Sequence, residues 1–354
     1  LIQGVGAAWL MTRLTSSPQM VALVQTAIML PLMLVALPAG AIADMFDRRK
    51  VALAGLAFAC AMAICLTLLA WAGLISPWIL LLFCFLIGGG VALFAPAWQA
   101  SIGEQVSEEH LPAAIALGSI SYNVARSFGP AIGGVIVAAF GAMAAFAANA
   151  LFYLPLVLAF MRWDRAHKPS RLPPERIDRA IVSGVRYALH SPPIRVVLIR
   201  THVAGLTGAS VSALTPLIAK DVLHGTAGTY GLLLGAYGVG AVTGAMGLDL
   251  VRQRLRPEQA ARLLAVLLGA MIVLAGISTH VVLTCAALMV AGAAWMILIA
   301  QFNVAVQMSA PRWVTARALA CFGSAVTGGL AIGAWGWGAI AGAFGTGEAM
   351  ILSG

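Results

Sequence analysis

The sequence predicts an all-α integral membrane protein with twelve spans in two six-helix halves, and three observations lead to that fold class. The first is composition: of the 354 residues, 61% are hydrophobic and 9% are charged, against roughly 25% charged residues in a soluble domain. The second is the length of the uncharged stretches, and the third is the placement of the few charges. Because so little polar surface cannot keep the chain dissolved, a soluble enzyme is excluded.

The uncharged stretches have the length of membrane helices, since a helix that crosses ~30 Å of hydrocarbon needs about 20 apolar residues. Residues 51–103 contain no Asp, Glu, Lys or Arg and are divided by a turn at 73–77; residues 263–311 repeat this arrangement around 278–280. The same rule predicts complete spans at 19–43, 51–72, 78–101, 113–138, 143–161, 196–219, 228–248, 261–279, 281–305 and 317–343. Incomplete first and last spans are expected at 1–12 and at the end of the chain.

The basic residues predict the orientation. The excess of 21 Lys and Arg over 12 Asp and Glu would suit nucleic acid, but cytoplasmic loops of membrane proteins carry the same excess. Alternate connections between the spans lie on the same side of the membrane. One set of alternate connections holds Arg48, Arg49, Lys50, Arg162, Arg165, Lys168, Arg171, Arg176, Arg179, Arg186, Arg195, Arg252, Arg254, Arg256, Arg262, Arg312 and Arg317. The other set of connections holds Arg13 and Lys220. We therefore expect the first set in the cytoplasm and no nucleic-acid partner.

One polar connector, 162–193, separates two sets of spans. Its prolines and mixed charges indicate a linker along the membrane surface, not a catalytic domain. It divides the chain into an N-terminal half, 1–161, and a C-terminal half, 194–354. A weak internal repeat supports this division, because Asp249 ends the eighth span as Asp44 ends the second. Two similar halves around a midplane site are typical of transporters.

The turn after the second span has the most specific local pattern. Residues 40–50 read Gly-Ala-Ile-Ala-Asp-Met-Phe-Asp-Arg-Arg-Lys. A glycine at position 40 lets helices approach closely, and Asp44 can accept hydrogen bonds from a neighbouring helix N-terminus. A simple positive-inside stop signal would explain the three cations but not Gly40 and Asp44.

A second pattern lies in the fifth span, where Gly129, Pro130, Gly133 and Gly134 follow Arg126. Gly129 and Gly133 form a GxxxG face for close helix packing, and Pro130 removes a backbone donor and can bend the helix. Generic small-residue packing is the alternative, but it would not by itself place Gly-Pro and Gly-Gly at this spacing.

These segments resemble the major facilitator superfamily. Gly40, Asp44, Arg48 and Arg49 match its hallmark turn, while Met45 and Asp47 depart from it; residues 125–134 resemble its antiporter motif, with Ala125 in the first glycine position. The sequence Asp47-Arg48-Arg49 in this turn is similar to the form found in a drug-exporter branch of the superfamily, which includes enterobactin exporters and transmembrane secretion effectors. The resemblance covers essentially the whole chain. It implies the major-facilitator fold, alternating access, and a cytoplasmic latch containing Asp44 and Arg48 that stabilises the outward-open state.

Polar residues inside the spans are the candidates for substrate binding. Arg126 costs about 2.5–3.5 kcal/mol on insertion scales, so it is expected to act on substrate or in gating, unless it extends to the interface. The other candidates can line a cavity or join helices by hydrogen bonds: Gln25, Gln99, Tyr122, Asn123, Asn149 and Asn303.

The sequence does not identify a proton carrier. No Asp or Glu lies in the middle of a complete span, so proton coupling is implied by the resemblance alone. Histidine is the side chain suited to changing its charge near neutral pH, so His202 is one candidate, although a lone histidine is more often a hydrogen-bonded helix contact. Asp44, Glu104 and Asp221 at span ends are the other candidates.

The function expected is export of a small amphipathic drug or siderophore across a bacterial inner membrane, by a monomer that uses protons and needs no cofactor or metal. No Walker lysine motif, HExxH or GxSxG is present, so ATP-driven pumping and proteolysis lack support. The alternatives are an importer or uniporter of the same fold, and a non-transporting membrane scaffold or receptor.

Overall fold

The computed structural model describes residues 2–107, 109–163, 186–188, 190–311 and 314–354, and the regular structure within these ranges is helical. Nine helices among the described residues are long and apolar enough to cross a membrane. The predicted all-α membrane class is therefore confirmed. Most of the predicted linker, 162–193, lies outside the described residues.

The helices begin and end within a few residues of the predicted spans. They are α1 (Ile2–Leu14), α2 (Pro18–Met45), α3 (Arg48–Trp71), α4 (Pro77–Gln105), α5 (Leu111–Arg162), α7 (Pro192–Leu217), the π-helical η1 (Ile218–Val222), α8 (Ala227–Arg254), α9 (Pro257–Ile277), α10 (Val281–Ser309), α11 (Thr315–Phe344) and α12 (Thr346–Ser353).

Short polar caps and prolines start several of these helices. Ser17 and Ser76 accept hydrogen bonds from the backbone N–H groups of Met20 and Ile79, and each is followed by a proline in the first turn. A side-chain oxygen at this position satisfies one of the free N–H groups of the first turn, and proline needs no partner there. The sequence therefore fixes these helix starts locally.

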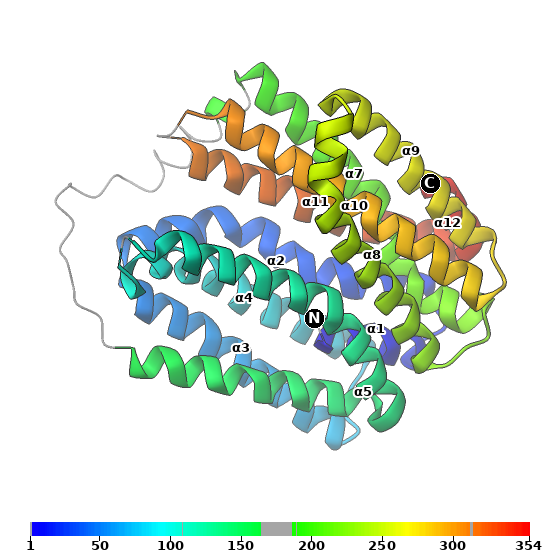
Figure 1. Ribbon diagram of the computed structural model, residues 1–354. Helices are drawn as coiled ribbons and strands as arrows, with labels where there is room; N and C mark the ends of the chain where they lie inside the picture. Colours follow the sequence, from blue (N-terminus) through cyan, green and yellow to red (C-terminus); the bar gives the residue numbers. More distant parts are fainter. Residues whose placement is uncertain (1, 108, 164–185, 189, 312–313) are drawn as a thin grey trace.

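The predicted spans 113–138 and 143–161 form one element, α5, with a sharp turn at Gly141. Gly141 has φ 82° and ψ 172°, while the residues around it stay helical. The expected connection between two helices is thus reduced to a single residue, because glycine has no Cβ to forbid this conformation. In Figure 1 the two arms of α5 both run toward the left from this turn and move apart as they do so.

For description we divide the helices by their order in the chain into a first group, α1–α5, and a second group, α7–α12 (Figure 1). In the first group, α1–α5, helix α4 packs against α2 and α3, and α5 packs against α1 and α3. In the second group, α7–α12, helix α11 packs against α7, α10 against α8 and α9, and α12 against α9. Helix α2 packs against α11 and α7 across the boundary, and α5 packs against α8. These crossing contacts join the two groups.

We call one end of this arrangement the basic end, because the cations predicted to be cytoplasmic lie at the helix termini there. In Figure 1 these termini point to the left and top of the molecule. They carry Arg48, Arg49, Lys50, Arg162, Arg252, Arg254 and Arg256. The turns between α1 and α2, η1 and α8, and α11 and α12 lie at the opposite end.

The turn at Gly141 gives a prediction for folding stability. Gly141→Ala should lower the free energy of unfolding by about 1–3 kcal/mol, because a Cβ is strained at this φ and ψ. A Cβ there meets nothing within 4 Å, so the loss comes from the backbone alone. Thermal unfolding of the purified protein in detergent measures it.

The matched control is Gly89→Ala in α4, where a Cβ also meets nothing within 4 Å and the backbone is helical. This change should leave the unfolding midpoint unchanged or raise it slightly. Equal midpoints for the two variants would contradict the strain argument.

Candidate functional site

The turn between α2 and α3 is short and capped on both sides. Helix α2 ends at Met45, and the backbone N–H of Phe46 donates to the carbonyl of Ile42. Asp47 is the N-cap of α3 and accepts a hydrogen bond from the N–H of Lys50 at 3.2 Å. A carboxylate at this position satisfies a free N–H group and favours the helix dipole. Asp47, where the family hallmark has glycine, thus starts helix α3.

Arg48 ties the start of α3 to the end of α4. One guanidinium nitrogen, Nη1, donates to the carbonyl of Ala100 and to Oε1 of Glu104, both at 3.0 Å. The side chains of Arg48 and Glu104 are 29% and 25% exposed, so the ion pair is partly shielded from solvent. A partly shielded pair with a second bond to a carbonyl is stronger than an isolated surface pair.

Arg49 ties the same turn to the end of α5. Its Nε donates to the carbonyl of Phe160 at 2.8 Å, and its Nη2 donates to the carbonyl of Met161 at 2.5 Å. Helix α5 ends at Arg162, so both carbonyls belong to the last turn, which has no partners within its own helix. A cation there also complements the helix dipole. We call the contacts of Arg48 and Arg49 with α4 and α5 the arginine latch.

An aromatic cluster packs behind the arginine latch. Phe160 contacts Phe94 and Trp98 of α4 edge-on, with ring centroids 5.9 and 5.7 Å apart, and Trp163 at 5.8 Å. Phe160 is 3% exposed. The backbone of Phe160 therefore binds Arg49 while its ring packs on α4, which holds α3, α4 and α5 together at the basic end.

The gating residues predicted around the arginine latch have mixed positions. Arg48 and Arg49 have the partners just described. Glu104, the partner of Arg48, was not among the predicted gating residues. Gly40 lies in α2, where an added Cβ would meet nothing within 4 Å. Asp44 lies in the last turn of α2, and its side chain is outside the described part of the structure. Its role in gating stays a prediction.

The predicted small-residue motif of α5 faces two different helices. A Cβ on Gly133 would lie 3.2 Å from Val5 of α1, and a Cβ on Gly134 would overlap the backbone of Gly231 in α8. Gly129 and Pro130 lie half-buried one turn earlier. The backbones of α5 and α8 therefore meet directly at Gly134, which brings the two groups of helices into contact.

Contacts between α2 and α11 extend the same boundary. A Cβ on Gly338 would overlap the side chain of Ala22, and the Thr26 hydroxyl donates to the carbonyl of Ala331 at 2.9 Å. Further along α2, Met33 reaches Gly328. Since α2 begins at the end opposite the basic end, these contacts occupy that end and the middle of the helix.

The predicted substrate-binding residues come from separate helices. The side chains of Arg126, Tyr122 and Asn123 lie outside the described part of the structure, although their backbone belongs to α5. Gln25 is half-buried in α2, and Gln99 is exposed in α4. Asn303 of α10 accepts a hydrogen bond from Gln307 at 2.6 Å. Asn149 has a buried Nδ2 without a hydrogen-bond partner.

The proton-coupling candidates differ in their surroundings. Nδ1 of His202 in α7 lies 3.2 Å from the carbonyl of Ala325 in α11, so His202 makes an interhelical contact. Nearby, Met33 of α2 approaches Gly328, which places His202 close to the boundary between the groups. Asp221 is exposed in η1 at the opposite end. The side chain of Asp44 is not described.

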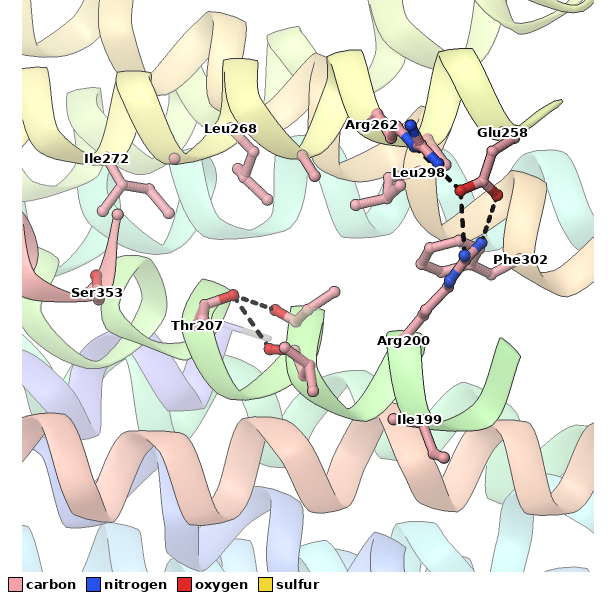
Figure 2. A pocket seen from close by; sticks show the side chains of 16 residues that line it. Ile199, Arg200, Thr207, Glu258, Arg262, Leu268, Ile272, Leu298, Phe302 and Ser353 are labelled. Carbon is pink, nitrogen blue, oxygen red and sulfur yellow. Dashed lines mark hydrogen bonds and ion pairs between the residues drawn. The ribbon is translucent and has the colours of Figure 1, made fainter. Parts of the chain in front are cut away.

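A cavity of about 620 Å³ lies within the second group, between α7, α9, α10 and α12. Figure 2 shows its apolar wall of Leu268, Ile272 and Leu298, with charged side chains at one end and Ser353 at the other. Of the predicted substrate-binding residues with described side chains, none lines it.

The charged end of this cavity contains an interaction that the sequence did not reveal. Arg200 of α7 pairs with both carboxylate oxygens of Glu258 in α9, at 2.7 and 3.1 Å, and Arg262 approaches Glu258 at 3.2 Å (Figure 2). The predicted span began at 196, but α7 begins at Pro192, so Arg200 lies two turns inside the helix. The sequence offered no spacing signal, because Arg200 and Glu258 are far apart along the chain.

A family model described as "transmembrane secretion effector" matches residues 1–354, the whole chain. The chain belongs to this family. The family belongs to the membrane transporters of the major facilitator type, and similar proteins are named as transporters and efflux pumps.

Three relatives show the range of this family. The chain is 28% identical over 253 residues to a multidrug efflux pump, Tap, of Mycobacterium tuberculosis, covering 69% of this chain and 60% of the relative. It is 24% identical over 242 residues to the staphyloferrin A transporter of Staphylococcus aureus, covering 67% and 60%. An MFS-type transporter of Bacillus subtilis, YfiS, is 27% identical over 184 residues, covering 51% and 43%. The matches thus span about half the length of these relatives.

Solved structures of transporters share the fold. A POT family transporter in complex with a thioalcohol-conjugated peptide has a TM-score of 0.74 at 15% identity, covering 99% of this chain and 90% of that one. The nucleoside transporter NupG has a TM-score of 0.73 at 12% identity, covering 99% and 93%. A bacterial homologue of the lysosomal transporter Spinster, inward-facing and unoccupied, has a TM-score of 0.72 at 12% identity, covering 97% and 80%.

The arginine latch gives a stability prediction for this family member. Arg49→Met removes two hydrogen bonds from a cation to the end of α5, so we expect the free energy of unfolding to fall by about 1–3 kcal/mol. Hydrogen–deuterium exchange should also rise at the Trp163 amide, which donates to the carbonyl of Ala159 in the same turn.

Lys50→Met is the matched control, because it removes the neighbouring cation, whose side chain is exposed. We expect it to change stability by less than about 0.5 kcal/mol. The capping role of Arg49 would be refuted by equal losses for the two variants.

Proposed function

We propose that this protein is a secondary active transporter that exports small amphipathic molecules of drug or siderophore type across a bacterial inner membrane. Counting the two arms of α5 separately, with α1 and α12 as the first and last segments, gives twelve spans in two halves, 1–161 and 194–354. The two halves would move against each other around a substrate between them, with the basic end in the cytoplasm.

The observation that carries this proposal is the uneven placement of contacts along the helices. At the basic end, the arginine latch joins helices of the first group to one another. At the opposite end and in the middle, Gly134 with Gly231, Gly338 with Ala22, and Thr26 with Ala331 join the two groups. Such an arrangement suits an inward-facing state, and it is consistent with the fold likeness to the inward-facing Spinster homologue.

The substrate class rests on the relatives. One is named a multidrug efflux pump and another a staphyloferrin A transporter. Both names suit an amphipathic substrate, which an apolar wall with a few polar groups would bind. We propose that Arg126, Tyr122 and Asn123 of α5 contribute polar groups, with Gln25, Gln99, Asn149 and Asn303 lining the path.

Proton antiport is the proposed energy source. Among the candidates for the proton carrier, His202 has the position best suited to it, since it lies at the contact of α7 with α11 beside Met33 of α2. A change of charge there would act on the boundary between the halves. Asp44 and Asp221 lie at helix ends, where proton binding would be coupled to opening less directly.

Uptake of a fluorescent drug into inverted membrane vesicles tests the function. We expect accumulation when the vesicle interior is acidified, and its loss when a protonophore collapses the pH gradient, because antiport exchanges internal protons for external substrate. Accumulation that ignores the gradient would refute proton coupling. Transport found only in right-side-out cells would indicate an importer, and none for any amphipathic probe would favour a scaffold or receptor.

The gating role of Asp44, which the family resemblance implies, has a separate kinetic test. Asp44→Asn should reduce the maximal rate of vesicle uptake several-fold and change substrate affinity less, because gating residues stabilise conformations and do not contact the substrate. Asp249→Asn, at the corresponding end of α8, is the control and should retain most of the rate. Unchanged transport by Asp44→Asn would contradict the role.

A further inference from the structure

Lys220 occupies an unexpected position for a cation. Among the Lys and Arg residues whose side chains the structure describes, it and Arg13 are the two at the end opposite the basic end, where the positive-inside rule disfavours such residues. Its side chain is half-buried, whereas Arg13 is exposed. A cation retained against the charge bias and partly shielded from solvent indicates a specific partner.

That partner is a helix terminus in the other group. The Lys220 ammonium donates a hydrogen bond to the carbonyl of Thr12. Helix α1 ends at Leu14, and the carbonyl of Met11 is already bonded to the N–H of Thr15. The Thr12 carbonyl therefore belongs to the last turn of α1, where carbonyls need a donor and the helix dipole attracts a cation. Lys220 thus caps a helix of the first group from the second.

A local change of helix type aims Lys220 at this carbonyl. After Pro216, the chain continues as the π-helix η1, in which the N–H of Leu223 donates to the carbonyl of Ile218 at 2.9 Å. The wider turn changes the direction of successive side chains. Ile218 and Ala219 are buried against the core, and Asp221 is exposed. Lys220 lies between Ala219 and Asp221 in the sequence, and its side chain extends to α1.

The hydrogen bond of Lys220 belongs to a larger contact between the two groups. Trp9 of α1 stacks on Tyr230 of α8 with ring centroids 6.1 Å apart and an angle of 16° between the planes, and Tyr230 is 3% exposed. The next residue, Gly231, meets Gly134. We call this contact the outer seam; its residues are Thr12, Trp9 and Gly134 on one side and Lys220, Tyr230 and Gly231 on the other.

We propose that Lys220 is a gating residue that holds the outer seam closed in the inward-facing state. The stack of Trp9 on Tyr230 and the glycine contact are non-directional packing, whereas the Lys220 bond is charge-assisted and requires α1 and η1 to lie at one distance. Opening the seam breaks this bond and leaves the Thr12 carbonyl to be hydrated. Lys220 therefore favours the closed seam, and this inference rests on the proposed alternating access.

The test measures opening of the seam without measuring transport. Thr26→Cys provides the reporter, because Thr26 contacts Ala331 across the boundary on the same side of the molecule. It is introduced into a protein whose five native cysteines are replaced by alanine. Whole cells are labelled from outside with a membrane-impermeant maleimide, which should reach the thiol faster when the two groups separate at this end of the molecule.

Lys220→Met, which keeps the length of the side chain and removes the charge, should raise the labelling rate about tenfold, because loss of a charge-assisted hydrogen bond shifts the population toward the open seam. Lys220→Arg, which keeps the charge, and Arg13→Met, which removes the neighbouring exposed charge, should stay within about twofold of the parent. Lys220→Leu, which also lacks a donor, should behave as Lys220→Met and serves if the latter does not accumulate in the membrane.

Two results would overturn the inference: an unchanged labelling rate in the Lys220→Met and Lys220→Leu proteins, or an equal rise in the Arg13→Met protein. These outcomes are separate from failure of the proposed function. If pH-gradient-dependent uptake is absent while Lys220→Met still increases labelling, the gating role stands and proton-driven export fails. If uptake is present and labelling is unchanged, export stands and the gating role fails.

Discussion

The constraint on which this structure depends is that every backbone carbonyl at a helix end needs a donor, and a membrane supplies few. Inside each helix the carbonyls are satisfied by the helix itself. At the ends they are not, and at the ends of α5 and α1 this protein meets the need with long cationic side chains from other helices. Arg49 binds the last turn of α5, and Lys220 binds the last turn of α1. The same interaction thus recurs at both ends of the molecule.

The two ends differ in which helices the cations connect. At the basic end, Arg48 and Arg49 join α3 to α4 and α5, all within the first group, so the proposed movement of the halves would leave these bonds intact. At the opposite end, Lys220 joins a helix of the second group to a helix of the first. A bond of this kind must break when the groups separate. The same interaction, a cation bound to a helix-end carbonyl, thus lies within one group at the basic end and between the two groups at the opposite end.

Close backbone approach complements these directional bonds. Gly134 and Gly231 let α5 and α8 touch where any larger side chain would separate them. In lipid, helix association is driven by such packing more than by the hydrophobic effect. The glycine contacts define where the two groups meet. The hydrogen bonds of Thr26 and Lys220 fix how far the helices of one group are shifted along those of the other. The cavity with Arg200 and Glu258, in contrast, lies wholly inside the second group.

The sequence by itself determined the helical membrane class, the approximate spans, the capping residues and the two motifs that resemble the family, because each depends on neighbours along the chain. It predicted that Arg48, Arg49 and Gly134 matter but not what they contact. Glu104, the end of α5, Gly231, the Arg200–Glu258 pair and the cap of α1 by Lys220 were decided only by the tertiary structure. The physical reason is that a long side chain binds whichever helix end packing brings within its reach, and sequence spacing carries no record of that neighbour.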